Sequence, residues 1–89
     1  YSMDKEKITN NIRKLRFHNS EMTQQQLAEK VGVSRQTIVA IEKEKYSPSL
    51  ELAFKIAYVF KVPLEEVFLF EPEEWYNSVI GGKLWKLLL

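Results

Sequence analysis

Residues 23–43 read TQQQLAEKVGVSRQTIVAIEK. Two short runs with helical spacing of apolar residues stand on either side of a Val-Gly-Val-Ser segment. Thr23 is a favourable N-cap, and Gln26 three residues later completes a capping box. Gly32 can take the left-handed conformation that ends a helix, and Ser34 can cap the next one. This stretch therefore predicts two short helices joined by a tight turn.

Two helices joined in this way form a helix-turn-helix pattern. The first helix braces across the DNA backbone, and the second lies in the major groove with its first residues against base edges. Arginine can bind guanine through two hydrogen bonds, glutamine can bind adenine likewise, and a Thr or Val methyl group can touch thymine. The predicted base-reading residues are Arg35, Gln36, Thr37 and Val39.

Apolar spacing continues on both sides of this stretch. Ile8, Ile12 and Leu15 recur at four and three residues, which predicts an amphipathic first helix over 4–19. A fourth helix follows a loop at 46–49, capped by one of its serines, and a short fifth helix covers 64–69. Strand signals are scarce in the first seventy residues, so the prediction is an all-α bundle of five helices.

Composition excludes several classes of site. The 89 residues contain no cysteine and one histidine, which removes disulfides and leaves His18 without partners for a metal site. No apolar run approaches the roughly 18 residues of a membrane span. Residues 1–50 carry nine basic and six acidic side chains, whereas residues 51–89 carry four and six. This asymmetry suggests a half that faces a polyanion, although solvated helix faces would give the same pattern.

The chain resembles the Xre, or Cro/phage-lambda-repressor, class of helix-turn-helix regulators over about residues 5–69. The motifs that carry the resemblance are Ile12-Arg13-Lys14-Leu15-Arg16, the stretch from Thr23 to Ile38, Ile41-Glu42, Pro48-Ser49-Leu50-Glu51-Leu52-Ala53, and Val62-Pro63-Leu64-Glu65-Glu66-Val67-Phe68. It implies a five-helix DNA-binding domain, placed here at residues 4–70, and we expect no cofactor.

The resemblance also implies roles for single residues. Arg35, Gln36 and Thr37 fall on the base-reading positions of the family, and Arg16 and Glu42 fall on positions that commonly form a salt bridge. Residues expected to contact the DNA backbone are Thr23, Gln24, Ser34, Lys43 and Lys45.

Glu44 departs from the family pattern, because many members carry glycine at this position. A left-handed turn is strained for a residue with a side chain. We therefore expect either a strained turn at Glu44 or a different end to the third helix.

The last residues, 71–89, read EPEEWYNSVIGGKLWKLLL. They predict either a helix that ends at Gly81 or a hairpin that turns at Gly81-Gly82. This short extension is too apolar to lie in water, so we expect it to be a dimerisation segment; packing on its own subunit and a weak membrane-surface anchor are the competing interpretations. The predicted dimerisation residues are Trp75, Ile80, Leu84, Trp85, Leu87 and Leu88.

The expected function is sequence-specific binding of double-stranded DNA by a cytoplasmic homodimer that represses transcription from a palindromic operator. Activation through an acidic patch is a variant of this hypothesis. The alternative is an antitoxin-type module whose extension binds a partner protein. No metal site or small-molecule ligand is expected, and the sequence shows no paired carboxylates, activated nucleophile or phosphate loop that would indicate an enzyme.

Overall fold

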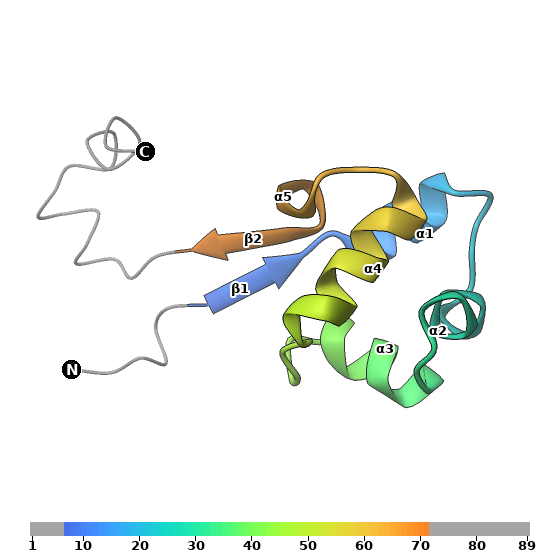
Figure 1. The fold of residues 1–89 in the computed structure, drawn as a ribbon, viewed down its shortest axis with the longest axis horizontal. Helices are drawn as coiled ribbons and strands as arrows, with labels where there is room; N and C mark the ends of the chain where they lie inside the picture. Colours follow the sequence, from blue (N-terminus) through green and yellow to red (C-terminus); the bar gives the residue numbers. More distant parts are fainter. Residues whose placement is uncertain (1–6, 72–89) are drawn as a thin grey trace, which may run out of the picture.

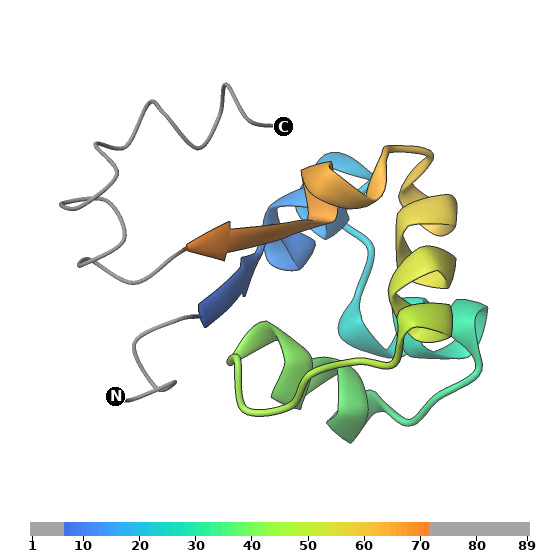
Figure 2. The same cartoon turned by 60° about the vertical axis from the view of Figure 1, so that its left-hand side comes forward.

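The structure is a computed structural model, and it describes residues 7–71. Five helices pack as a bundle, and two strands extend from one end of the bundle in both views (Figures 1 and 2). The elements are β1 (Lys7–Asn10), α1 (Ile12–His18), α2 (Gln24–Val31), α3 (Arg35–Glu42), α4 (Leu50–Phe60), α5 (Leu64–Val67) and β2 (Phe68–Glu71). The predicted bundle of five helices is confirmed, with a small sheet added to it.

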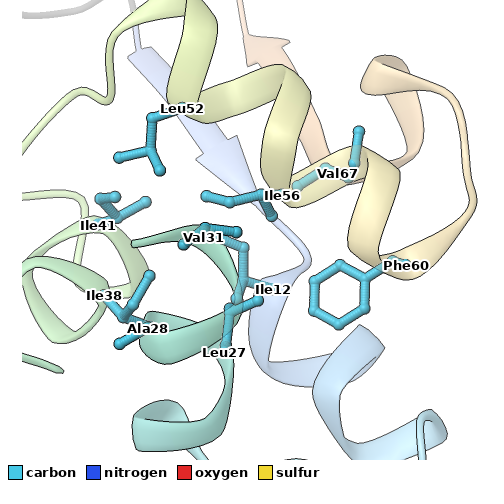
Figure 3. Close-up of a cluster of buried hydrophobic side chains, with 11 residues drawn as sticks. Ile12, Leu27, Ala28, Val31, Ile38, Ile41, Leu52, Ile56, Phe60 and Val67 are labelled. Carbon is cyan, nitrogen blue, oxygen red and sulfur yellow. The ribbon is translucent and has the colours of Figure 1, made fainter. Parts of the chain in front are cut away.

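One hydrophobic core receives side chains from all five helices (Figure 3). The spacing of apolar residues identified this core from the sequence, because each helix buries the stripe that repeats every three or four residues. The largest side chains that are fully buried are Ile12, Leu27, Ile38, Ile41, Ile56 and Val67. This core holds α2 and α3 in a fixed relation and leaves their outer faces at the surface.

The predicted helix ends around the turn are confirmed. The Gln26 backbone N–H donates to Thr23 Oγ1 at 3.0 Å, and the Gln26 side chain accepts from the Thr23 backbone N–H at 2.8 Å. Gly32 has a φ of +76°, which is the left-handed conformation that ends α2. Ser34 caps α3, and Ser49 rather than Ser47 caps α4. Local sequence therefore sets both ends of α2 and the start of α3.

The left-handed turn expected at Glu44 is present. Glu44 has a φ of +61°, and its backbone N–H donates to the Ile41 carbonyl oxygen at 3.0 Å. The Lys45 N–H donates to the Ala40 carbonyl oxygen at 2.9 Å. These two bonds complete the motif that normally ends a helix with glycine, here formed around a glutamate.

The predicted first helix over 4–19 is wrong at its beginning. Residues 7–10 form β1, and α1 starts only at Ile12, so Ile8 belongs to a strand rather than to the helical stripe. The strand forms because β2, more than fifty residues later, offers a pairing partner that local spacing does not report. Residues 4–6 of the predicted helix lie outside the described part of the chain.

The predicted fifth helix over 64–69 is too long by two residues. α5 ends at Val67, and Phe68 and Leu69 begin β2. The strands are antiparallel, with Ile8 opposite Phe70 and Asn10 opposite Phe68. Residues that stand directly opposite one another lie on the same face of a sheet. Phe68 packs against the core, whereas Ile8 and Phe70 are 53% and 56% exposed.

Two asparagines tie the sheet to the helices. The Asn10 side-chain amide donates to the Ile41 carbonyl oxygen at 2.9 Å, near the end of α3. The side-chain oxygen of Asn10 accepts from the Ile12 N–H at 3.2 Å, at the start of α1. The Asn11 amide donates to the Glu66 carbonyl oxygen at 3.0 Å. The start of α1 is therefore fixed relative to both α3 and α5.

The predicted extension over 71–89 falls almost wholly outside the described residues. The choice between hairpin and helix, and the dimerisation residues Trp75, Ile80, Leu84, Trp85, Leu87 and Leu88, lie in that part. Within residues 7–71, every helix is too short or too polar to cross a membrane.

Candidate nucleic-acid interface

The outer face of α3 carries the side chains predicted to read bases. Ile38 and Ile41 are buried on the inner side of this helix. Burial of these two positions turns Arg35 and Gln36 outward, and both are exposed. A long cation and a primary amide therefore stand at the first turn of the helix, where a recognition helix contacts base edges.

Thr37 and Val39 are less accessible than Arg35. Both are half-buried, and the Thr37 hydroxyl lies 3.0 Å from the Ser34 hydroxyl at the helix cap. The Thr37 backbone N–H also donates to Ser34 Oγ at 3.2 Å. Base reading by Thr37 would thus depend on its methyl group, because its hydroxyl already takes part in the cap.

Two of the predicted backbone contacts are also helix caps. The Thr23 and Ser34 hydroxyls both accept a hydrogen bond from the helix that they cap. Accepting this bond leaves each hydroxyl hydrogen able to donate to a phosphate oxygen, at a helix start where the dipole favours an anion. The backbone N–H of Thr23 is not available for a phosphate, because it donates to the Gln26 side chain at 2.8 Å. Lys43 and Lys45 are exposed on either side of the left-handed turn at Glu44.

A partly buried salt bridge connects α1 to the end of α3, as the family resemblance implied. Arg16 Nε lies 2.7 Å from Glu42 Oε2, and a second guanidinium nitrogen donates to Glu42 Oε1 at 3.0 Å. The third nitrogen donates to the Met22 carbonyl oxygen at 2.9 Å. The two side chains are only 14% and 9% exposed. Two parallel hydrogen bonds of this kind fix geometry as well as charge.

Gln24 joins this network, which the sequence reasoning missed. Its side-chain amide donates to Glu42 Oε1 at 3.2 Å. Glu42 thus binds Arg16 from α1 and Gln24 from the start of α2. Nothing in the local sequence signals this third member, because the contact joins residues 18 positions apart.

These groups border a shallow concavity of about 640 Å³ between α1, the start of α2 and α3. It gathers Thr23, Gln24, Arg35, Val39 and Lys43 from the nine predicted DNA-contact residues. Ser34, Gln36, Thr37 and Lys45 do not line it. Arg13 of α1 does line it, although the sequence reasoning assigned it no role.

The charge of this concavity is positive. Arg13, Arg35 and Lys43 are exposed cations, and Glu21 is the one exposed acid among its lining residues. The other acid, Glu42, is neutralised by Arg16. A surface of this size and sign suits the phosphate backbone of a nucleic acid. The described residues hold no group of three His, Cys, Asp or Glu side chains arranged for a metal ion.

A family profile described as helix-turn-helix matches residues 12–67, well over half of the chain. The chain belongs to the helix-turn-helix family. The chain is similar to the Xre class of regulators that the sequence motifs suggested. Members of this class bind DNA and regulate transcription, and they do not catalyse a reaction.

The similar proteins agree with this assignment. An uncharacterized HTH-type transcriptional regulator of Methanocaldococcus jannaschii is 56% identical over 63 residues, covering 68% of this chain and 96% of that protein. One from Archaeoglobus fulgidus is 60% identical over 57 residues, covering 64% and 81%. YgzD of Bacillus subtilis is 47% identical over 66 residues, covering 74% and 98%.

Among solved structures, a protein from Bacteroides fragilis thought to bind DNA has a TM-score of 0.60 and 28% identity. The match covers 68% of this chain and 97% of that one. These alignments cover nearly all of the M. jannaschii, B. subtilis and B. fragilis proteins. Roughly a quarter to a third of this chain lies outside them.

Proposed function

We propose that this helix-turn-helix protein is a cytoplasmic, sequence-specific repressor that binds a palindromic operator as a homodimer. Residues 4–70 form the DNA-binding domain, and residues 71–89 extend the surface through which two copies associate. The observation that carries this proposal is the position of Arg35 and Gln36. Both are exposed at the first turn of α3, and Arg35 also lines a cationic concavity.

Base reading in this proposal belongs to the outer face of α3. Arg35 donates to O6 and N7 of a guanine, and Gln36 exchanges two hydrogen bonds with an adenine. Val39 and the Thr37 methyl group contact thymine methyl groups. The backbone contacts come from Gln24, Lys43, Lys45 and the capping residues Thr23 and Ser34, which set the register of the helix on the duplex.

Association of two copies is supported by the apolar surface next to residue 71. Ile8, Leu69 and Phe70 are large apolar side chains on β1 and β2, and each is at least 42% exposed. The strongly apolar segment that follows begins where this sheet ends. Ile8 and Phe70 stand opposite each other and so share one face of the sheet, and exposed apolar area of this kind marks an interaction surface. A two-fold dimer would place its two reading helices about 34 Å apart, one turn of DNA.

Repression would be steric, since a dimer seated over a promoter excludes the polymerase from the same duplex. Selection of bound DNA from a random pool tests the proposal directly. We expect a consensus with two inverted half-sites whose centres are about 10 base pairs apart. Recovery of sequences without any consensus would contradict specific reading, and a single unrepeated half-site would contradict the dimer.

A further inference from the structure

Arg13 has no structural role that explains its position. It is exposed in the first turn of α1, where the positive end of the helix dipole makes a cation slightly unfavourable. None of the ion pairs between described residues includes it. Yet it lines the concavity that borders α3, as Lys43 does.

Arg16, one turn further along α1, shows why Arg13 differs. All three guanidinium nitrogens of Arg16 donate to protein oxygens, on Glu42 and Met22. The charge of Arg16 is therefore neutralised within the protein, by Glu42. Arg13, three residues earlier, has no such partner among residues 7–71, so its charge and its donors remain available at the same concave surface.

Arg13 also has a defined position relative to α3. Asn10, three residues before it, donates to the Ile41 carbonyl oxygen at 2.9 Å, and Ile41 is two residues before Lys43. Asn10 itself lines the concavity. The bond from Asn10 therefore holds the start of α1 against the end of α3, so that the two cations border one hollow.

We propose that Arg13 and Lys43 together bind one phosphate of the DNA backbone beside the end of the reading helix. In this arrangement α1, which lies outside the helix-turn-helix motif, forms part of the interface. Arginine suits this position because its guanidinium binds two phosphate oxygens at once, while the lysine adds a point charge. The inference rests on the proposed function, because it needs α3 to lie against duplex DNA.

The test compares three variants of the full chain, Arg13→Ala, Arg13→Lys and Lys14→Ala. Lys14 is a matched control, because it is exposed in the same turn of α1 but does not line the concavity. Dissociation constants are measured at several salt concentrations on the selected duplex and on a shuffled duplex. Thermal unfolding confirms that each variant is folded.

We expect Arg13→Ala to weaken binding to both duplexes by a similar factor. The slope of log K against log salt should fall by about 0.9 for each subunit bound, the value for one lost phosphate contact. Arg13→Lys should recover most of the slope, and Lys14→Ala should leave it nearly unchanged. The double variant Arg13→Ala/Lys43→Ala should lose less than the sum of the two single losses, because both side chains bind one phosphate.

Ethylation interference locates the contact. At one phosphate, ethylation should block DNA binding by the natural protein but have no further effect on binding by Arg13→Ala. Equal effects of Arg13→Ala and Lys14→Ala on the salt slope would overturn the inference, as would an unchanged interference pattern. Such a failure is distinguishable from failure of the proposed function, because the selected consensus and its dependence on Arg35 would remain.

Discussion

Substitution of Arg35 tests base reading, as distinct from general affinity for DNA. Arg35 is exposed at the first turn of α3 and stands beside the concavity. We expect Arg35→Ala to cost about 1–3 kcal/mol on the selected operator and to relax preference at one base position. Lys43→Ala should instead weaken all duplexes about equally. Competition binding against operators changed at single positions measures the base preference of each variant. If Arg35→Ala kept the base preference of the natural protein, Arg35 would not read a base.

Glu42 is not a predicted DNA contact, but its loss should disturb the arrangement of the helices that form the interface. Its removal leaves the Arg16 guanidinium, 14% exposed, without its counter-charge. We expect Glu42→Ala to destabilise the fold by about 3 kcal/mol. The matched control is Glu51→Ala, which breaks the exposed Glu51–Lys55 pair and should cost no more than about 0.5 kcal/mol. Urea unfolding measures both, and equal losses would show that the Arg16–Glu42 pair contributes no more than a surface pair.

Lys61 occupies the left-handed C-cap of α4, with a φ of +57°. Glycine avoids the steric cost that a side chain brings to this conformation, about 1 kcal/mol. We expect Lys61→Gly to raise the free energy of unfolding by about 0.5–1 kcal/mol. Lys55→Gly, in the interior of the same helix, should lower it by about 1 kcal/mol. Thermal unfolding distinguishes the two signs.

At the scale of elements, Asn10 joins the sheet to the reading helix. Its amide and its side-chain oxygen bond the end of α3 and the start of α1. We expect Asn10→Ala to cost about 1–2 kcal/mol, since two partly buried hydrogen bonds are lost. Asn10→Asp keeps the acceptor for the Ile12 N–H but loses the donor to Ile41, so it should also be less stable than the natural protein. Full stability of Asn10→Asp would show that the bond to α3 contributes little.

The elements also show where prediction from sequence succeeds and where it stops. The capping box at Thr23, the glycine turn at Gly32 and the buried faces of α2, α3 and α4 were predicted correctly, because each depends on neighbours within four residues. The strand β1 was read as helix, because Ile8 has suitable helical spacing with Ile12 but pairs with Phe70. Spacing along the chain carries no information on such a distant partner.

At the scale of the whole molecule, the exposed sheet and the segment that follows it should control association. Deleting residues 72–89 keeps β2 intact, and we expect it to raise the dissociation constant of the dimer. Phe70→Ser in the full chain should act in the same direction, because Phe70 is 56% exposed on that surface. The control is Phe54→Ser, which removes a similarly exposed side chain from α4.

Sedimentation velocity over a range of protein concentrations measures these changes. The alignment with the M. jannaschii regulator covers 96% of that protein with 63 residues, so a domain of this kind does not require a long extension to exist. We therefore expect the truncated chain to stay folded. A dimer unaffected by both the deletion and Phe70→Ser would place the association surface elsewhere.

The sequence by itself determined the family, both ends of α2, the start of α3, the core residues and the outward position of Arg35 and Gln36. All of these follow from local hydrogen bonding and from the helical repeat, which acts over one or two turns. Only the tertiary structure decided that residues 7–10 form a strand, that Gln24 joins the Arg16–Glu42 pair, and that Arg13 borders the same concavity as Lys43. The reason is physical: these features depend on contacts between segments far apart along the chain, and such contacts exist only after the core has closed.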